Sequence, residues 1–284
     1  MQDLVAEYGG ALPASGDLLA WLDDFSAEHW DFRKALGVER HQVTAPSFAP
    51  ARRDLVLNAA GALGFIESAP PRLTEYDHLL VLGGLARTCL QRVEHAARIL
   101  ADGVVVPEVT GLGSFRPLGD AEQELLPGGA DYEVDALEAG FRKEFAASTS
   151  ERRSSAGAVS FESWTVHRLR GRRDLRLRVL AAPSSEPGVR RANTADTYRF
   201  WAREAEVRAG ARVLVVTSPI YVPFQHCDAI RTLAVPHDCQ VETVGLDVSR
   251  ATLPQAAGAT GADRYLQEIR SAIRSMRRLQ ADAG

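Results

Sequence analysis

The apolar segment RVLVV at 212–216 constrains the fold of this chain more than any other part of its sequence. A short apolar run without polar alternation is typical of a strand buried on both faces, as in a parallel sheet. Comparable runs, separated by helical patterns, recur at 78–82, 104–109, 175–181 and 240–246. Strands that alternate with helices favour a doubly wound fold. We therefore expect an α/β protein with a Rossmann-like parallel sheet in which these runs are neighbours.

Helical patterns fill the intervals between these runs. Apolar residues recur every three or four positions from Ala86 to Leu100, which predicts an amphipathic helix. The same spacing predicts helices over 133–145 and 264–279. Asn193–Thr194 is expected to cap a further helix, which extends through Ala205.

Three segments carry weaker patterns. Residues 115–131 are rich in Gly and Pro and are expected to form a loop, and residues 146–163 are expected to be a mobile insertion. The segment 163–169 either pairs with 175–181 as a hairpin or is itself the third parallel strand, and we favour 175–181 as the core strand.

The N-terminal part of the chain has a different character, with helical clusters at 18–25 and 55–65 and no strand alternation. The stripe of apolar residues along 264–279 needs cover, so we expect that helix to pack with the N-terminal ones. The expected organisation is a small helical annex at 1–76, a Rossmann-like core at 77–250 and a C-terminal helix in 251–284 that packs with the annex.

Composition excludes several classes of protein. The net charge is −4 and the pI is about 6.0, whereas a dedicated nucleic-acid binder is usually basic, so no nucleic-acid partner is expected. No signal peptide and no membrane-spanning run is expected. Three cysteines without CxxC spacing suit a reducing compartment and no metal site, so we expect a cytoplasmic protein. The oligomeric state is left open.

Arginines gather in two stretches of the sequence, at 168–178 and 264–278. We favour a solvated sheet edge and a solvated helix face for these stretches, with phosphate contact as the alternative.

A small-molecule ligand is expected at the carboxyl ends of the strands, where doubly wound sheets bind their ligands. This rule selects four loops, at Gly83–Gly84, Thr110 to Ser114, 186–194 and 217–221. Each has a plainer interpretation as well: a tight turn for the glycines, a helix cap for Asn193, and a favourable helix-dipole position for Glu133. Cys227 beside His226 is a poor thiolate–base pair because adjacent helical residues do not face one another.

The order of these motifs resembles a known family. DHLLVLGG, VTGLGS, YEVDAL, RRANTADT and VVTSPIY follow one another between residues 77 and 221. This order is similar to the YdcF/SanA/ElyC-like family, the domain of unknown function 218, and LAWLDDFS at 19–26 resembles its YdcF branch. The resemblance implies S-adenosylmethionine binding in a cleft. The residues that it implies for this cleft, together with those that the strand-end rule adds, are Gly83, Gly84, Arg92, Thr110, Gly111, Gly113, Ser114, Glu133, Asn193, Thr194, Asp196, Thr217 and Ser218.

The leading hypothesis is therefore a protein that binds S-adenosylmethionine or a related adenosyl nucleotide, with use of that ligand as a group donor in an enzyme left open. Glu133 and Tyr221 are the candidates for proton handling, although Tyr221 stands where the family has His. Two alternatives remain, a non-catalytic sensor or binding module and a nucleotide or phosphate-ester hydrolase.

Overall fold

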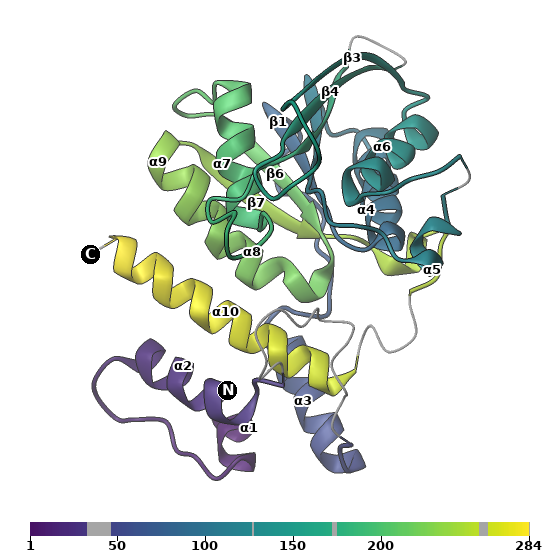
Figure 1. Cartoon of the computed structure of the whole chain (residues 1–284). Helices are drawn as coiled ribbons and strands as arrows, with labels where there is room; N and C mark the ends of the chain where they lie inside the picture. Colours follow the sequence, from purple (N-terminus) through teal and green to yellow (C-terminus); the bar gives the residue numbers. More distant parts are fainter. Residues whose placement is uncertain (33–46, 127, 172–174, 256–260, 284) are drawn as a thin grey trace. The chain divides into compact units, whose positions relative to one another are not determined.

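The computed structural model describes residues 1–32, 47–126, 128–171, 175–255 and 261–283. The chain divides into two compact units, which are described separately below (Figure 1). The α/β unit comprises Ser68–Ser218 and Ala229–Pro254. The helical unit comprises Met1–Glu67, Pro219–Asp228 and Gln255–Gly284.

A single sheet forms the centre of the α/β unit. Its described strands are arranged in the order β3-β4-β5-β2-β1-β6-β7. The five strands from β5 to β7 in this order are parallel, whereas β3 and β4 extend the sheet in antiparallel fashion. The α/β class with a largely parallel sheet is thus confirmed. The strands are β1 (His78–Leu82), β2 (Glu108–Gly113), β3 (Ser148–Ser154), β4 (Thr165–Arg170), β5 (Arg176–Ala181), β6 (Arg212–Thr217) and β7 (Gln240–Gly245).

Helices cover both faces of this sheet, as Figure 1 shows. On one face α4 (Ala86–Ala101) and α6 (Glu133–Glu144) belong to the same core as Leu79 and Val81 of β1. On the other face α7 (Thr194–Ala205) and the π-helical turn η3 (Ile230–Ala234) belong to the same core as Leu80 and Leu82. Successive residues of a strand point to opposite faces, so a strand with a helical layer on each side has to be apolar throughout. The remaining short elements of this unit are α5 (Asp120–Gln123), α9 (Val235–His237) and η4 (Val248–Arg250).

The second strand lies four residues later in the chain than expected. The apolar run 104–109 predicts the strand, but β2 begins at Glu108, after Pro107, and continues through Gly113. Proline lacks the N–H that a central strand has to donate. Glu108 is nevertheless buried within β2. Its carboxylate accepts hydrogen bonds from Thr110 Oγ1 at 3.0 Å and from Arg178 Nε at 3.0 Å, and these bonds compensate for its burial. The predicted glycine loop at Thr110 to Ser114 is therefore wrong.

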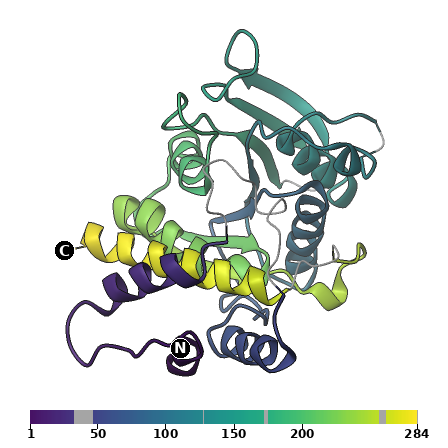
Figure 2. The same cartoon turned by 60° about the horizontal axis from the view of Figure 1, so that its bottom comes forward.

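The antiparallel edge of the sheet contains a strand that the sequence did not indicate. Residues 146–163 were expected to be an insertion, yet β3 pairs with β4 along its length (Figure 2). β4 pairs in turn with β5, so the hairpin interpretation of 163–169 is confirmed. β3 is largely exposed, and its SerThrSerGluArgArgSer sequence has no apolar pattern by which to recognise it.

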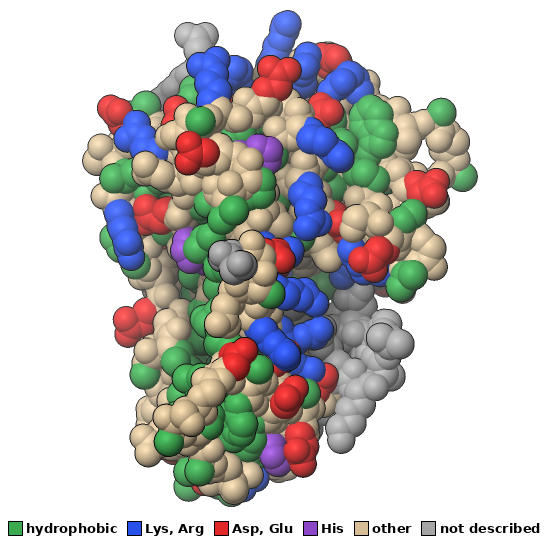
Figure 3. All heavy atoms as spheres, turned by 90° about the vertical axis from the view of Figure 1, so that its left-hand side faces the viewer, with side chains coloured by type: hydrophobic (Ala, Val, Ile, Leu, Met, Phe, Trp, Pro, Cys, Tyr) green, Lys and Arg blue, Asp and Glu red, His purple; other side chains and the backbone are tan. Residues whose placement is uncertain are grey.

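The helical unit has its own apolar core. α10 (Ala262–Ala283) packs against α2 (Leu18–His29) and α3 (Pro50–Ala62), with Leu266 and Ile269 fully buried between them. α1 (Gln2–Glu7), η2 (Pro219–Tyr221) and the first part of α8 (Val222–Ala229) complete the unit. None of the helices in the described ranges is long and apolar enough to cross a membrane. Charged side chains of both signs are interspersed on the face of the molecule in Figure 3.

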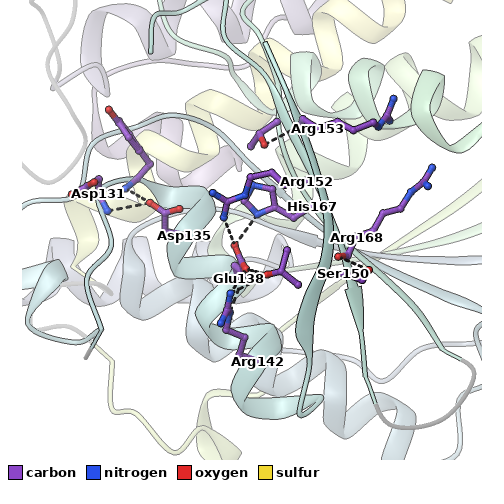
Figure 4. A network of polar contacts seen from close by, with 12 residues as sticks. Asp131, Asp135, Glu138, Arg142, Ser150, Arg152, Arg153, His167 and Arg168 are labelled. Carbon is purple, nitrogen blue, oxygen red and sulfur yellow. Dashed lines mark hydrogen bonds and ion pairs between the residues drawn. The ribbon is translucent and has the colours of Figure 1, made fainter. Parts of the chain in front are cut away.

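A buried polar network ties α6 to the antiparallel edge (Figure 4). The carboxylate of Glu138 accepts hydrogen bonds from Nδ1 of His167 at 2.7 Å and from Nη2 of Arg142 at 2.7 Å. The hydroxyl of Thr149 donates to the same carboxylate, and the Arg152 guanidinium lies 3.4 Å from it. Burial alone raises the pKa of Glu138, but these partners outweigh that effect and hold the pKa below its ordinary value.

We expect Glu138→Ala to lower the free energy of unfolding by about 3 kcal/mol, because it leaves the buried His167 and the half-buried Thr149 without their acceptor. A depressed carboxyl pKa stabilises the fold above the ordinary value of 4.5 and loses that effect as the pH falls through the folded value. Urea unfolding of wild type should therefore show a steeper loss of stability below pH 4.5 than unfolding of the variant. Lys143→Ala, at an exposed residue of the same helix, is the control and should change little.

Candidate functional site

The strand order reverses between β1 and β6, which are direct neighbours. From β1 the chain adds β2 beside it, then forms β3 at the far edge and comes back through β4 to β5 beside β2. It then crosses to the other side of β1 to add β6 and β7. At such a reversal the connections leave in opposite directions, and a crevice forms outside the carboxyl ends of the strands. Gly83 and Gly84 follow β1 at this point, and Ser218 follows β6.

Arg92 links the two strand ends. Its side chain comes from α4, and the residue is 1% exposed. Nη1 donates to the carbonyl oxygen of Leu82 at 2.9 Å and also to that of Gly83. Nε and Nη2 donate to Oγ of Ser218 at 3.2 and 3.1 Å. A guanidinium is costly to bury, and these bonds place its charge where β1 and β6 end.

Glu133 is the second buried charge-bearing group at this edge. It is the first residue of α6, and its carboxyl group lies against Gly83 and accepts a hydrogen bond from the Ser114 hydroxyl. Burial raises the pKa of Glu133 above its ordinary value, although Ser114 and the guanidinium groups of Arg116, Arg191 and Arg92 act in the opposite direction. A carboxyl with a raised pKa is suited to proton transfer near neutral pH.

The loop after β2 adds an ion pair that the sequence analysis missed. Nη1 and Nη2 of Arg116 donate to the two carboxylate oxygens of Glu122 at 2.9 and 2.8 Å, and Nη2 also donates to the Gly84 carbonyl oxygen at 2.9 Å. Glu122 accepts from the backbone N–H of Ala86, the first residue of α4, at 2.7 Å. A carboxylate of the chain thus occupies the helix N-terminus, which ordinarily attracts anions.

These residues form one group, which we call the switch-point cluster. It unites six residues expected from the sequence with the Arg116–Glu122 pair. No local pattern marks Arg116 or Glu122, because their loop has no helical or strand period. The members of the cluster are Gly83, Gly84, Arg92, Ser114, Arg116, Glu122, Glu133 and Ser218.

Three expected site residues lie inside β2 instead of in a loop. Thr110 is fully buried, and a Cβ at Gly111 would lie 3.1 Å from the Phe141 ring. A Cβ at Gly113 would lie 2.9 Å from Leu137. These glycines let α6 approach the sheet closely, which is a packing role. Thr217 ends β6 and is fully buried.

The expected contacts at 193–196 form a helix cap. Oδ1 of Asn193 accepts from the backbone N–H of Asp196 at 3.0 Å, and Asp196 accepts from that of Asn193 at 3.0 Å. Together they make a capping box at the start of α7, with Thr194 as its first helical residue. Arg190 pairs with Asp196 at 2.6 Å, and this pairing contributes to a lowered pKa of Asp196.

Tyr221 belongs to the helical unit, where its ring centroid lies 6.0 Å from that of Phe224. The two residues expected to handle protons therefore lie in different units. Cys227 also belongs to the helical unit, and burial raises its pKa to about 11, which disfavours a thiolate. Within the described ranges, no three His, Cys, Asp or Glu side chains are grouped so as to hold a metal ion.

Fold and site together define a doubly wound α/β protein with a buried polar cluster at its switch point. The chain belongs to the family of the protein named "Uncharacterized protein Rv3785" in Mycobacterium tuberculosis strain H37Rv. The two are 31% identical over 318 positions, which cover 98% of this chain and 85% of the relative. "Uncharacterized protein Mb3814" of Mycobacterium bovis is equally similar. The family model described as the Rv3785 N-terminal domain matches residues 1–64.

This family corrects the resemblance to the YdcF/SanA/ElyC-like proteins, which is wrong. LAWLDDFS lies in α2, within the segment that the Rv3785 N-terminal domain matches. The other motifs are a glycine turn after a strand, a helix cap and a hydroxyl residue at a strand end. Any doubly wound sheet favours such residues at these positions, so their order reflects the fold and not the family.

We expect Gly83→Ala to lower the free energy of unfolding by about 2 kcal/mol through overpacking. Its Cβ would collide with the Glu133 carboxyl group and lie 2.9 Å from the backbone oxygen of Leu112, which has no freedom to move. Gly84→Ala is the matched control, because the nearest atoms to its Cβ would be 3.5 Å away. Equal melting temperatures for the two variants would contradict this account of Gly83.

Glu133→Gln should raise the melting temperature at neutral pH, because it removes a carboxyl group whose charged form is disfavoured by burial. A raised carboxyl pKa stabilises the fold below the ordinary value of 4.5 and loses that effect as the pH rises through the folded value. The stability advantage of the variant should therefore grow as the pH rises. Thermal melts from pH 4.5 to pH 8 measure it, and an advantage that shrinks with rising pH would refute the assignment.

Proposed function

We propose that the α/β unit binds a small ligand of the adenosyl nucleotide class at the carboxyl ends of β1 and β6. The observation that supports this proposal is the switch-point cluster, in which Arg92 and Glu133 are buried where the strand order reverses. Buried ionisable groups in a crevice are costly for stability and gather at functional sites. Doubly wound sheets of this strand order bind nucleotides at this position.

S-adenosylmethionine remains the first ligand to test within this class. The support for the class is now the strand order and the cluster, since the family resemblance that suggested this ligand was wrong. Glu133 would exchange a proton with the ligand or with a second substrate if the site is catalytic. We place the protein in the cytoplasm, on the basis of three buried free cysteines, with a small molecule as its partner and neither nucleic acid nor membrane.

A non-catalytic sensor is the second candidate, and the Arg116–Glu122 pair favours it. The Glu122 carboxylate already occupies the N-terminus of α4. A ligand with an anionic group therefore has to displace Glu122 to reach the N-terminus of α4. This exchange would couple ligand binding to a change in the conformation of the segment that carries Glu122.

Thermal melts and titration calorimetry with S-adenosylmethionine, S-adenosylhomocysteine and ATP test the proposal. A ligand at one hundred times its Kd should add about 2.7 kcal/mol of stability. We expect Ser218→Ala to weaken binding about tenfold, which corresponds to about 1.4 kcal/mol, because Arg92 loses its link to β6. Glu122→Gln should strengthen binding, since it weakens the competing anion at the α4 N-terminus.

Lys143→Ala, at the far end of α6, is the control and should bind as wild type does. Absence of binding by all three compounds would overturn the adenosyl class. Binding that is unchanged in both Ser218→Ala and Glu122→Gln would place the ligand away from the switch-point cluster. Turnover of bound S-adenosylmethionine would favour the enzyme over the sensor.

A further inference from the structure

A second hollow of the α/β unit lies at the opposite end of the strands from the switch-point cluster. It has a volume of about 400 Å³, which is within the size range of small-molecule sites. It lies where β2 and β5 begin, where β4 ends and where α7 ends. Its polar lining comprises Glu108, Ser150, Arg168, Arg176, Arg178, Glu204 and Glu206.

A block of arginines forms one wall of this pocket. In the antiparallel ladder of β4 and β5, Arg168 lies directly opposite Arg178, and Arg170 lies directly opposite Arg176. Like charges at directly opposed positions destabilise a sheet. A bound anion beside Arg168 and Arg176 would reduce this repulsion.

Each arginine of the lining has a carboxylate partner, and these ion pairs differ in strength. Arg178 is held firmly, because Glu108 accepts from its Nε at 3.0 Å and the backbone oxygen of Glu204 accepts from its Nη1 at 3.0 Å. Arg176 lies 3.7 Å from the same Glu108, and its side chain is 68% exposed. Arg168 pairs with Glu151 at 2.8 Å, and both side chains are about half exposed, so this pair is weak.

The opposite wall is the C-terminal end of α7. Glu204 there is paired with Arg153 of β3. Glu206 caps the helix in a left-handed conformation with φ of 51°, and it is one of the residues that line the pocket. The end of a helix carries a partial negative charge, so this wall repels an anion while the arginine wall attracts one. An anionic group in the pocket is therefore directed toward Arg168 and Arg176.

We propose that this pocket binds a small ligand through a phosphate or carboxylate group held by Arg168 and Arg176. The guanidinium group matches both anions with paired hydrogen bonds. Arg178 is already paired with Glu108, so the anion is held by Arg168 and Arg176. The two walls carry charges of opposite sign, so the part of the ligand that lies toward α7 is neutral or cationic. This second site is independent of the ligand proposed for the switch-point cluster.

Titration calorimetry with inorganic phosphate and with citrate, followed by thermal melts in each, tests the proposal. We expect one of the two anions to bind saturably, and the stronger one identifies the group that the natural ligand carries. Arg176→Ala and Arg168→Ala should each weaken that binding at least tenfold. Glu206→Gln should strengthen it severalfold, because it removes a negative charge from the facing wall.

Arg199→Ala is the matched control, because Arg199 is an exposed arginine on the N-terminal half of the same helix α7 and does not line the pocket. It should leave anion binding unchanged. Equal loss in Arg199→Ala and Arg176→Ala, or no saturable binding of either anion, would overturn the proposal. Stabilisation by heparin alone, with none by phosphate or citrate, would also overturn it and would indicate a surface for polyanions.

Discussion

The buried guanidinium of Arg92 is the interaction on which the arrangement of the α/β unit depends most. It joins the carbonyl oxygens at the end of β1 to the hydroxyl that follows β6, and these are the two strands between which the strand order reverses. Parallel strands leave their last carbonyl groups without ladder partners where they diverge into connections. Arg92 satisfies these groups from within α4, and it brings a positive charge to the place where a ligand would approach.

Polar groups around Arg92 are satisfied by one another. Glu133 accepts from Ser114, and Glu122 binds both Arg116 and the N-terminus of α4. A polar network is worth burying only when its members are paired, and a paired network resists small changes. The consequence is a closed cluster, so that the anionic ligand proposed above would enter it only by displacing one of its own carboxylates. The pocket at the other end of the strands differs from this cluster, because it is open and is lined by both arginines and glutamates, with Arg168 and Arg178 directly opposite one another in the ladder.

The short motifs at the strand and helix ends agree with the observed fold but suggested the wrong family, and both results have the same physical reason. Glycine after β1 is required because the Glu133 carboxyl group lies against it, and Asn193 caps α7 with Asp196 as its partner. Both features follow from the geometry of a strand that turns into a helix, so unrelated doubly wound proteins share them. Membership of the Rv3785 family rests on similarity along almost the whole chain and on the match of residues 1–64 to its N-terminal domain. Most of the motifs that suggested the other family lie outside residues 1–64.

The sequence by itself determined the five parallel strands and the helices between them. A strand that is buried on both faces consists of apolar residues throughout, so it can be recognised without knowing which strands pair with it. The strand-end rule placed Gly83 and Ser218 at one edge, whereas Arg92 and Glu133 were named only through the family resemblance that proved wrong, and the structure brings them there. Only the tertiary structure decided that β2 extends to Gly113, that β3 exists, and that Arg116 and Glu122 close the cluster. These features depend on partners distant in the sequence or on exposed residues without period, so no local pattern encodes them.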